Sequence, residues 1–229
     1  MPTLVIANKV YSSWSLRPWI LMRHHGLDFE EIVIPLDQPD TRQNILKYSP
    51  AGKVPILIDG DTRVWESLAI IETLAERHPD LPIWPSDPAA RAMARSIASE
   101  MHAGFRALRS ALPMNLGKRY DHRDRGADVE ADVERVTTIW REARSRFGTG
   151  GPFLFGAEFG AADAMYAPVC TRLDTYGWPV DPTSRAYMDA VLALPAYREW
   201  LEGALAETWL VPHDEIDEEP IAQLRGLNA

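Results

Sequence analysis

The sequence predicts a small α/β domain followed by an all-helical domain. Strand-like apolar runs alternate with helical patterns over the first 78 residues. Prolines crowd residues 79–88, and beyond them only helical patterns remain. Because proline fixes the backbone and removes a hydrogen-bond donor, this segment should be a stiff linker. We therefore expect domains at 1–78 and 89–229, joined by 79–88.

The first domain has the order β-α-β followed by β-β-α. Its strand patterns are rich in apolar and β-branched residues, and Gly60–Asp61 marks a hairpin turn between the last two. The first crossover should make strands one and two parallel. The predicted strands are 3–8, 29–36, 54–59 and 63–65, and the predicted helices are 16–25, 44–48 and 67–78.

The second domain is predicted to be a helical bundle. Apolar residues at steps of three and four run through 89–112 and predict one long helix there. Further helices are expected at 128–147, 161–173, 184–193 and 196–205. The acidic run 214–219 should be a solvated tail.

Composition narrows the class of protein. The net charge of −9 disfavours nucleic-acid binding, which needs a surplus of Lys and Arg. No apolar run approaches the ~18 residues of a membrane span. The single cysteine, Cys170, excludes an internal disulfide and a cysteine metal cluster, and we predict no metal site. It favours a reducing, cytoplasmic location.

The segment after the first strand carries three hydroxyls, on Ser12, Ser13 and Ser15. They lie in a loop that enters a helix, where free N–H groups and the helix dipole favour negative charge. The ordinary alternative is simple N-capping of that helix, because serine is a preferred cap.

Two further motifs carry possible binding chemistry. Val54–Pro55 opens a strand after Lys53, and a cis bond there would expose the Val54 backbone to an extended peptide. A trans proline in a loop is the commoner alternative. Glu66–Ser67 begins a helix, whose N-terminus can bind a carboxylate. A capping pair is the alternative there.

In this order and spacing, the three motifs resemble the cytosolic glutathione S-transferase family. The Val-Pro follows the serine loop by some 40 residues, and the Glu-Ser comes about a dozen residues later. The resemblance covers nearly the whole chain and is closest to serine-type tau-like and zeta-like bacterial members. It implies a thioredoxin-like first domain and a glutathione transferase. It also implies glutathione as co-substrate, a small hydrophobic electrophile and a homodimer.

The resemblance also assigns residues. In the serine classes the catalytic serine lies five residues before an arginine of the first helix, and counting back from Arg17 gives Ser12. Ser13 and Ser15 are neighbours that could assist or substitute. The implied glutathione-binding residues are Lys53 near the glycine carboxylate, Val54 on the cysteinyl backbone, Pro55 as a cis proline, and Glu66 and Ser67 at the γ-glutamyl end.

A serine hydroxyl suits this chemistry because it needs only to donate. A free thiol has a pKa of about 8.5, so a few per cent is thiolate near pH 7. The thiolate is the nucleophile, and a hydroxyl hydrogen bond beside a helix N-terminus favours it. The electrophile should lie between the domains, against Trp14 and the helix of Met101, Phe105 and Leu108. Core packing is the ordinary alternative for that helical stripe.

The sequence departs from the family pattern at two positions. Trp14 stands where zeta-like isomerases have a cysteine, which argues against maleylacetoacetate isomerase activity. Gly160 replaces the hydroxyl residue of a Ser/Thr-x-x-Asp capping box, leaving Asp163 in a structural role. The alternatives that stay open are a glutathione-dependent isomerase or dehalogenase, and a non-enzymatic ligand-binding or interaction protein.

Overall fold

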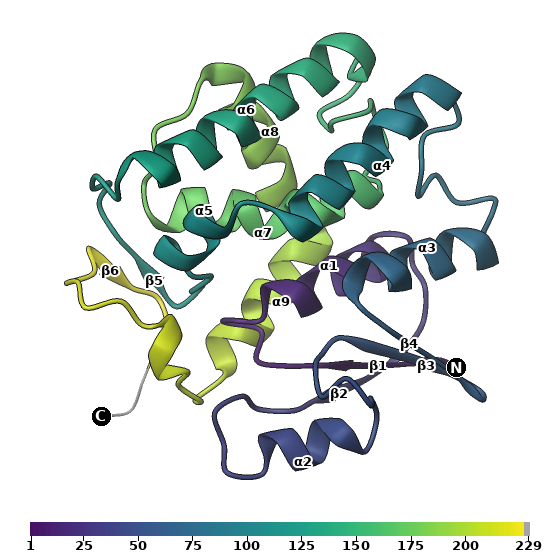
Figure 1. Cartoon of the computed structure of the whole chain (residues 1–229), viewed down its shortest axis with the longest axis vertical. Helices are drawn as coiled ribbons and strands as arrows, with labels where there is room; N and C mark the ends of the chain where they lie inside the picture. Colours follow the sequence, from purple (N-terminus) through teal and green to yellow (C-terminus); the bar gives the residue numbers. More distant parts are fainter. Residues whose placement is uncertain (227–229) are drawn as a thin grey trace.

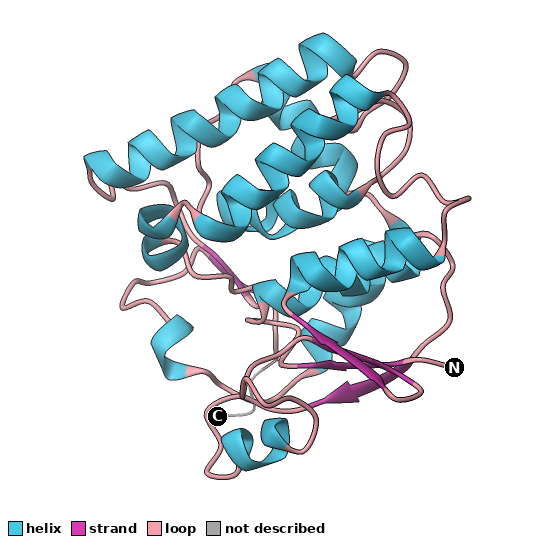
Figure 2. Ribbon diagram, turned by 45° about the vertical axis from the view of Figure 1, so that its right-hand side comes forward, coloured by secondary structure: helices cyan, strands magenta, loops and turns pink. Residues whose placement is uncertain are grey.

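The computed structural model describes residues 1–226, so positions 227–229 of the expected second domain lie outside the described residues. An N-terminal domain with a mixed sheet lies beside a helical C-terminal domain (Figures 1 and 2). The N-terminal elements are β1 (Thr3–Ile6), α1 (Ser13–His24), β2 (Glu30–Val33), α2 (Thr41–Leu46), β3 (Ile56–Asp59), β4 (Thr62–Trp65) and α3 (Ser67–Arg77).

The sheet has the strand order β2-β1-β3-β4. β1 and β2 are parallel, as predicted, and the other two pairings are antiparallel. The strands are shorter than their apolar runs, and β1 ends at Ile6 rather than at Asn8. Asn8 is in the loop instead, where its side-chain oxygen accepts the Leu36 N–H at 2.7 Å.

Alternation along the strands separates two apolar layers. Leu4 and Ile6 of β1 belong to the large core that includes α1 and α3. Val5 points the other way, into a small cluster with Ile45 of α2. Successive strand residues face opposite sides of a sheet, so both faces of this one are covered. Figure 1 shows α1 and α3 on one side of the sheet and α2 on the other.

The C-terminal domain is built around α7, which is almost entirely buried and packs against α1 of the N-terminal domain. Among residues 1–226, no helix is both long and apolar enough to cross a membrane. The helices are α4 (Pro88–Ala103), α5 (Arg106–Ala111), α6 (Ala127–Phe147), α7 (Ala161–Thr175), α8 (Pro182–Leu192), α9 (Pro195–Ala206) and the single turn η1 (Pro212–Asp214).

The single helix predicted over 89–112 is wrong, because it breaks into α4 and α5 at Gly104 and Phe105. A Cβ on Gly104 would lie 2.8 Å from the Glu100 carbonyl oxygen. Phe105 has a φ of 57°, in the left-handed region. The new helix start is held by Asp132 of α6, whose carboxylate accepts the Leu108 N–H at 3.0 Å.

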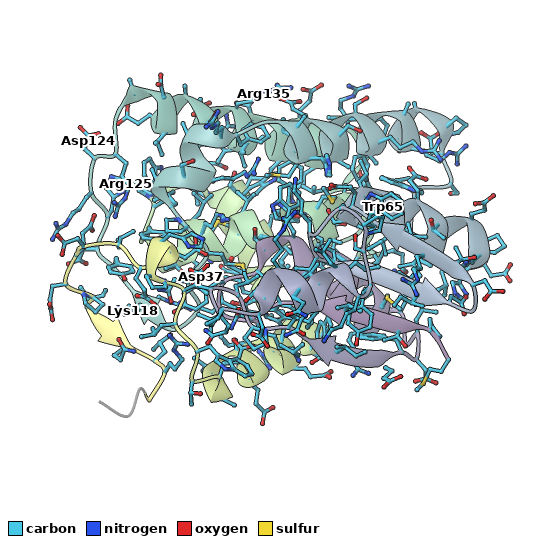
Figure 3. All side chains as sticks on the ribbon, turned by 60° about the horizontal axis from the view of Figure 1, so that its bottom comes forward. Asp37, Trp65, Lys118, Asp124, Arg125 and Arg135 are labelled. Carbon is cyan, nitrogen blue, oxygen red and sulfur yellow. The ribbon has the colours of Figure 1, made fainter. Side chains whose placement is uncertain are left out.

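The acidic run 214–219 is not a solvated tail, and this prediction is also wrong. Glu215 bonds Lys118 at 2.7 Å and Glu218 bonds Arg125 at 2.6 Å. Figure 3 labels Lys118 and Arg125 on the segment 118–125, which lies beside the C-terminal residues 214–223. A short antiparallel pair, β5 (Lys118–Arg119) with β6 (Ala222–Gln223), adds two strands that the helical patterns did not reveal.

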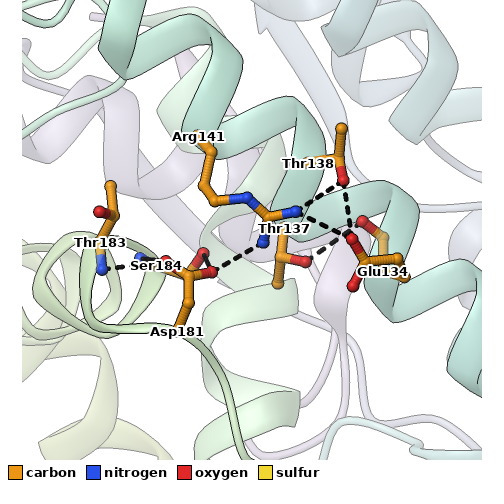
Figure 4. A network of polar contacts seen from close by, with 7 residues as sticks. All are labelled: Glu134, Thr137, Thr138, Arg141, Asp181, Thr183 and Ser184. Atoms are coloured by element: carbon orange, nitrogen blue, oxygen red, sulfur yellow. Dashed lines mark hydrogen bonds and ion pairs between the residues drawn. The ribbon is translucent and has the colours of Figure 1, made fainter.

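A surface network ties α6 to α8. Arg141 of α6 bonds the carboxylates of Asp181 and Glu134, each at 2.9 Å (Figure 4). Asp181 also caps α8 by accepting the N–H groups of Thr183 and Ser184. Exposed pairs of this kind contribute at most about 1 kcal/mol each, so this network orients α8 more than it stabilises the fold.

The N-terminus of α7 explains the departure at Gly160. A Cβ there would lie 2.8 Å from the carbonyl oxygen of Ile83, which belongs to the linker segment. That same oxygen accepts the Ala161 N–H at 2.7 Å. Asp163 keeps its half of the capping box by accepting the Gly160 N–H at 3.0 Å, and its second oxygen accepts Leu154 N–H.

Candidate active site

Two adjoining pockets lie between the domains. The smaller, of about 290 Å³, is lined from the N-terminal domain by the Lys53–Pro55 loop and the β4–α3 junction. The larger, of about 610 Å³, is lined by the serine loop, by α5 and by Arg172 of α7. Trp14, Lys53, Val54 and Arg109 line both. A further cavity of about 660 Å³ lies at the linker, away from every predicted site residue.

All five predicted binding residues line the smaller pocket, which we call the peptide pocket: Lys53, Val54, Pro55, Glu66 and Ser67. The Val54–Pro55 bond is cis, as the family resemblance implied. The Ser67 hydroxyl is buried without a hydrogen-bond partner in the described part of the chain. Buried polar groups are rarely left unsatisfied, so this hydroxyl marks a place for a ligand atom.

Glu66 has a backbone conformation that non-glycine residues rarely adopt, with a φ of 70° just before α3. Such conformations cost about 1–3 kcal/mol and concentrate at functional sites. Its carboxylate lies 3.7 Å from His102 Nε2 of α4. Burial, together with Arg17 and Arg109, lowers the pKa of His102 despite Glu66 nearby. The lowered pKa favours the neutral form of the His102 imidazole.

Ser12 and Ser15 form a hydroxyl relay at the start of α1. The Ser12 hydroxyl donates to Ser15 Oγ at 2.8 Å, and Ser15 Oγ accepts the Ala7 N–H at 3.2 Å. Although Ser12 occupies the N-cap position, its side chain makes no capping bond. Ser12 lines the larger pocket, whereas Ser15 is fully buried behind it. Simple N-capping therefore does not describe Ser12.

Ser13 lines the larger pocket beside a buried arginine. Arg172 Nη2 donates to Ser13 Oγ at 3.3 Å, and Arg17 Nη1 donates to the Ser13 carbonyl at 3.0 Å. Since an arginine N–H can only donate, the Ser13 hydroxyl hydrogen stays free for another acceptor. Ser13 is thus a second candidate donor at the same wall.

The larger pocket, which we call the arginine pocket, is strongly cationic. Arg106, Arg109 and Arg172 line it, with Arg17 behind Trp14. Burial lowers the pKa of Arg172 to about 10, so it remains charged at pH 7. Within residues 1–226 these four guanidinium groups form no ion pair, and the pocket wall has one carboxylate, on Asp214. Arg17 and Arg172 are buried, and buried charges without an ion-pair partner are costly, so this wall favours an anionic ligand.

Trp14 is the aromatic residue in the wall shared by the two pockets. The guanidinium carbons of Arg17 and Arg109 lie 4.0 and 4.9 Å from its ring centroid. His102 meets it edge-on at 5.3 Å. Cations within about 6 Å of an indole are attracted to it, so these contacts fix the ring between the pockets.

Of the four residues expected at the electrophile wall, one lines the two pockets and three do not. Met101, Phe105 and Leu108 are buried core residues that line neither pocket, as the ordinary alternative held. Trp14 does line both pockets. Sequence reasoning missed Arg109, Arg172 and Asp214. The available signal was Arg172 itself, the one basic residue in the largely apolar, buried helix α7.

Family models match both domains of the chain. The model described as glutathione S-transferase, N-terminal domain, matches residues 11–77, and its C-terminal counterpart matches residues 88–203. The chain belongs to the glutathione S-transferase family. It is an enzyme family, and glutathione is its co-substrate.

Relatives of this glutathione S-transferase are named for two activities. It is 36% identical over 202 residues to glutathione S-transferase Z2 of Arabidopsis thaliana, covering 83% of this chain and 88% of that protein. It is 34% identical over 194 residues to a probable maleylacetoacetate isomerase of Caenorhabditis elegans, covering 82% and 90%. Both sets of names agree with a glutathione-dependent enzyme.

Solved structures agree on the fold. A glutathione transferase homologue from Burkholderia gl BGR1, solved with bound glutathione, has a TM-score of 0.69 at 23% identity. The similarity covers 89% of this chain and 97% of that one. The tau-class enzyme of mango, Mangifera indica, has a TM-score of 0.67 at 22% identity, covering 89% and 95%.

Proposed function

We propose that this transferase binds glutathione in the peptide pocket and uses Ser12 to hold its sulfur as a thiolate. The electrophile enters the arginine pocket next to it. The observation that carries the proposal is the position of Ser12. Its hydroxyl lies in the wall of the arginine pocket, two residues from Trp14, the wall of both pockets.

Glutathione fits the peptide pocket in one direction. Lys53 is a cation for the glycine carboxylate, and the backbone of Val54 has no hydrogen-bond partner in the described part of the chain. The cysteinyl unit can pair with that backbone as an added strand. The unpartnered Ser67 hydroxyl and the Glu66 carboxylate then take the γ-glutamyl carboxylate and ammonium.

The Ser15 hydroxyl behind Ser12 allows the Ser12 hydroxyl to point at the sulfur. Hydroxyl hydrogens rotate to suit their acceptors, so Ser15 can donate to Ser12 while still accepting the Ala7 N–H. Ser12 is then free to donate to the sulfur. Each donor in such a chain polarises the next, and the N-terminus of α1 adds a favourable dipole. Serine does not lose its proton, because it acts only as a donor to the anion.

The second substrate is a small electrophile with both apolar and anionic parts. Trp14, Leu36 and Ile45 give the arginine pocket its apolar surface. Arg106 and Arg109 favour a negatively charged group, which refines the hydrophobic electrophile expected from the family. The thiolate sulfur bonds to the electrophilic carbon, and the displaced electron pair departs with a leaving group or moves onto a conjugated acceptor of the substrate. The guanidinium groups stabilise the negative charge of the substrate.

A second candidate is glutathione-dependent isomerisation of a carboxylate-bearing substrate. The arginine pocket favours it, and some relatives are named maleylacetoacetate isomerase. Comparing turnover of maleylacetone with conjugation of 1-chloro-2,4-dinitrobenzene separates the two. Arg106→Gln should raise KM for the carboxylate substrate roughly tenfold and leave KM for the neutral one unchanged. Equal effects on both would remove the anionic assignment.

Titration of the bound thiol tests the serine mechanism. The thiolate absorbance of the glutathione complex is followed against pH in the wild type, Ser12→Ala and Ser13→Ala. Ser12→Ala should raise the thiol pKa, and Ser96→Ala on the exposed face of α4 is the matched control. A rise with Ser13→Ala alone would move the role to Ser13. No rise in either variant would leave the backbone of α1 as the stabilising group. Glutathione binding without turnover of any electrophile would favour the non-enzymatic alternative.

We also propose a homodimer, a cytoplasmic location and the division into 1–78, 79–88 and 89–229. Trp65, on the edge strand β4, is 41% exposed beside the peptide pocket, and a second copy would cover it. Symmetric homodimers are the commonest oligomers. Size-exclusion chromatography with light scattering decides the point, and a monomer mass at micromolar concentration would overturn it.

A further inference from the structure

The serine loop connects β1 to α1 and carries Ser12. Groups of the C-terminal domain bind its backbone at two consecutive residues, Lys9 and Val10. The Glu207 carboxylate accepts the Lys9 N–H at 2.6 Å and the Val10 N–H at 3.2 Å. Trp200 Nε1 donates to the Lys9 carbonyl at 2.9 Å. The Leu116 N–H donates to the Val10 carbonyl at 3.2 Å. The loop that carries Ser12 is thus attached to α9 and to the segment after α5.

Tyr11, the residue before Ser12, is held in the same way. Its hydroxyl donates to Glu215 at 2.5 Å and accepts from Arg225 Nη2 at 2.7 Å. Lys118 bonds the other oxygen of Glu215 at 2.7 Å. Burial and Glu215 raise the pKa of Tyr11. Because its proton is already committed to a carboxylate, Tyr11 cannot serve as the donor to sulfur.

Two of these holding groups are buried charges. Arg225 is 2% exposed, and Glu207 is 9% exposed. Taking charges out of water is costly, and neutral groups of similar shape often support a fold as well. Glu207 directs both of its oxygens at the serine loop, and Arg225 directs one nitrogen at Tyr11. Both residues therefore bind the serine loop and fix its position.

We propose that Glu207 and the Tyr11–Glu215–Arg225 cluster are positioning residues for Ser12. The C-terminal segment thereby sets the geometry that stabilises the thiolate, although it belongs to the other domain. The inference rests on the proposed role of Ser12. A displacement of about 1 Å in a positioned group can cost roughly a hundredfold in rate, which is why a loop of this kind needs external support.

Glu207→Gln tests the proposal in the full chain. The substitution keeps the size of the side chain but replaces one carboxylate oxygen with an NH2 group. That group can only donate, so it cannot accept the backbone N–H that the oxygen accepted. Glu202→Gln, exposed on the same helix, is the matched control. We expect the pKa of bound glutathione to rise and kcat near pH 7 to fall roughly tenfold. KM for glutathione should stay within about twofold of the control, because the peptide pocket is not altered.

The following outcomes decide the proposal. A folded Glu207→Gln variant with a wild-type thiol pKa would overturn it, and so would a higher KM for glutathione with an unchanged kcat. If that variant does not fold, Tyr11→Phe is measured in the same way, and a wild-type thiol pKa there overturns the proposal. Ser12→Ala separates the two hypotheses. If Ser12→Ala raises the thiol pKa and neither positioning variant does, only the positioning role fails.

Discussion

The Oγ atoms of Ser12 and Ser15 lie 2.8 Å apart, and only Ser12 reaches a pocket. Ser15 is fully buried and accepts the Ala7 N–H. Three motif serines that look equivalent in sequence therefore occupy different positions. Ser12 lies in the pocket wall and is hydrogen-bonded to Ser15 behind it, whereas Ser13 lies in that wall beside Arg172.

Ser15→Ala should act on catalysis through Ser12. It leaves the buried Ala7 N–H unsatisfied, so we expect a loss of stability of about 1–2 kcal/mol. It also removes the hydroxyl that can donate to Ser12 when Ser12 turns to the sulfur, so the thiol pKa of bound glutathione should rise, but less than in Ser12→Ala. In a double-mutant cycle the two effects should not add, because both residues act through one hydrogen bond. Additive thiol pKa changes would show that Ser15 acts independently.

Ser67→Ala should weaken glutathione binding without weakening the fold. The hydroxyl has no partner in the described part of the chain, so its loss leaves no other group unsatisfied. A hydrogen bond to a charged group contributes about 1.5–3 kcal/mol, so KM for glutathione should rise roughly tenfold or more. Steady-state kinetics and thermal unfolding measure the two quantities. A lower Tm with an unchanged KM would assign the hydroxyl to the fold instead.

Gly160→Ser should destabilise the protein even though serine is the better helix cap. A new Cβ would lie 2.8 Å from the Ile83 carbonyl oxygen, so the linker or α7 must shift. Overpacking of this kind costs about 1–3 kcal/mol, more than the ~1 kcal/mol that a serine cap contributes. Urea unfolding compares it with Ala157→Ser, at an exposed position of the preceding loop. A stabilised Gly160→Ser variant would mean that the linker yields easily.

Asp163 should give the stability a defined pH dependence. Burial raises its pKa to about 6, whereas the pKa of an aspartate carboxyl in the unfolded chain is about 3.9. Between these values the folded state binds a proton that the unfolded state does not. This contribution is therefore present at low pH and is lost as the pH rises through about 6.

Asp163→Asn removes that titration and provides the comparison. From pH 5 to pH 7, the free energy of unfolding of the wild type should fall by about 1 kcal/mol relative to the variant. Urea unfolding at both pH values measures the difference, in which the other titrating groups cancel. An equal change in the free energy of unfolding between pH 5 and pH 7 in both proteins would contradict the raised pKa.

The sequence predicted the fold and most of the peptide pocket because those features are local. Strand alternation, the Val54–Pro55 step and the Glu66–Ser67 helix start each involve a few neighbouring residues. The break at Gly104 was hidden because the apolar spacing continues through it. It is fixed by Asp132, which lies on another helix.

Other features depend on contacts between segments far apart in the chain. Arg172 lies 159 positions from the Ser13 hydroxyl that it contacts, and Glu215 lies 204 positions from Tyr11. Periodicity carries no information on such pairs. An acidic run is normally solvated, and here the cations of residues 118–125 bind it to the protein.

The shared wall formed by Trp14 has a consequence for what happens after the bond forms. With glutathione and the electrophile bound as proposed, their conjugate would span both pockets and keep the contacts of both substrates. The two halves are then tethered, and each raises the effective concentration of the other. On that binding mode, we expect departure of the conjugate, rather than the attack by sulfur, to limit turnover, with strong product inhibition in steady-state kinetics.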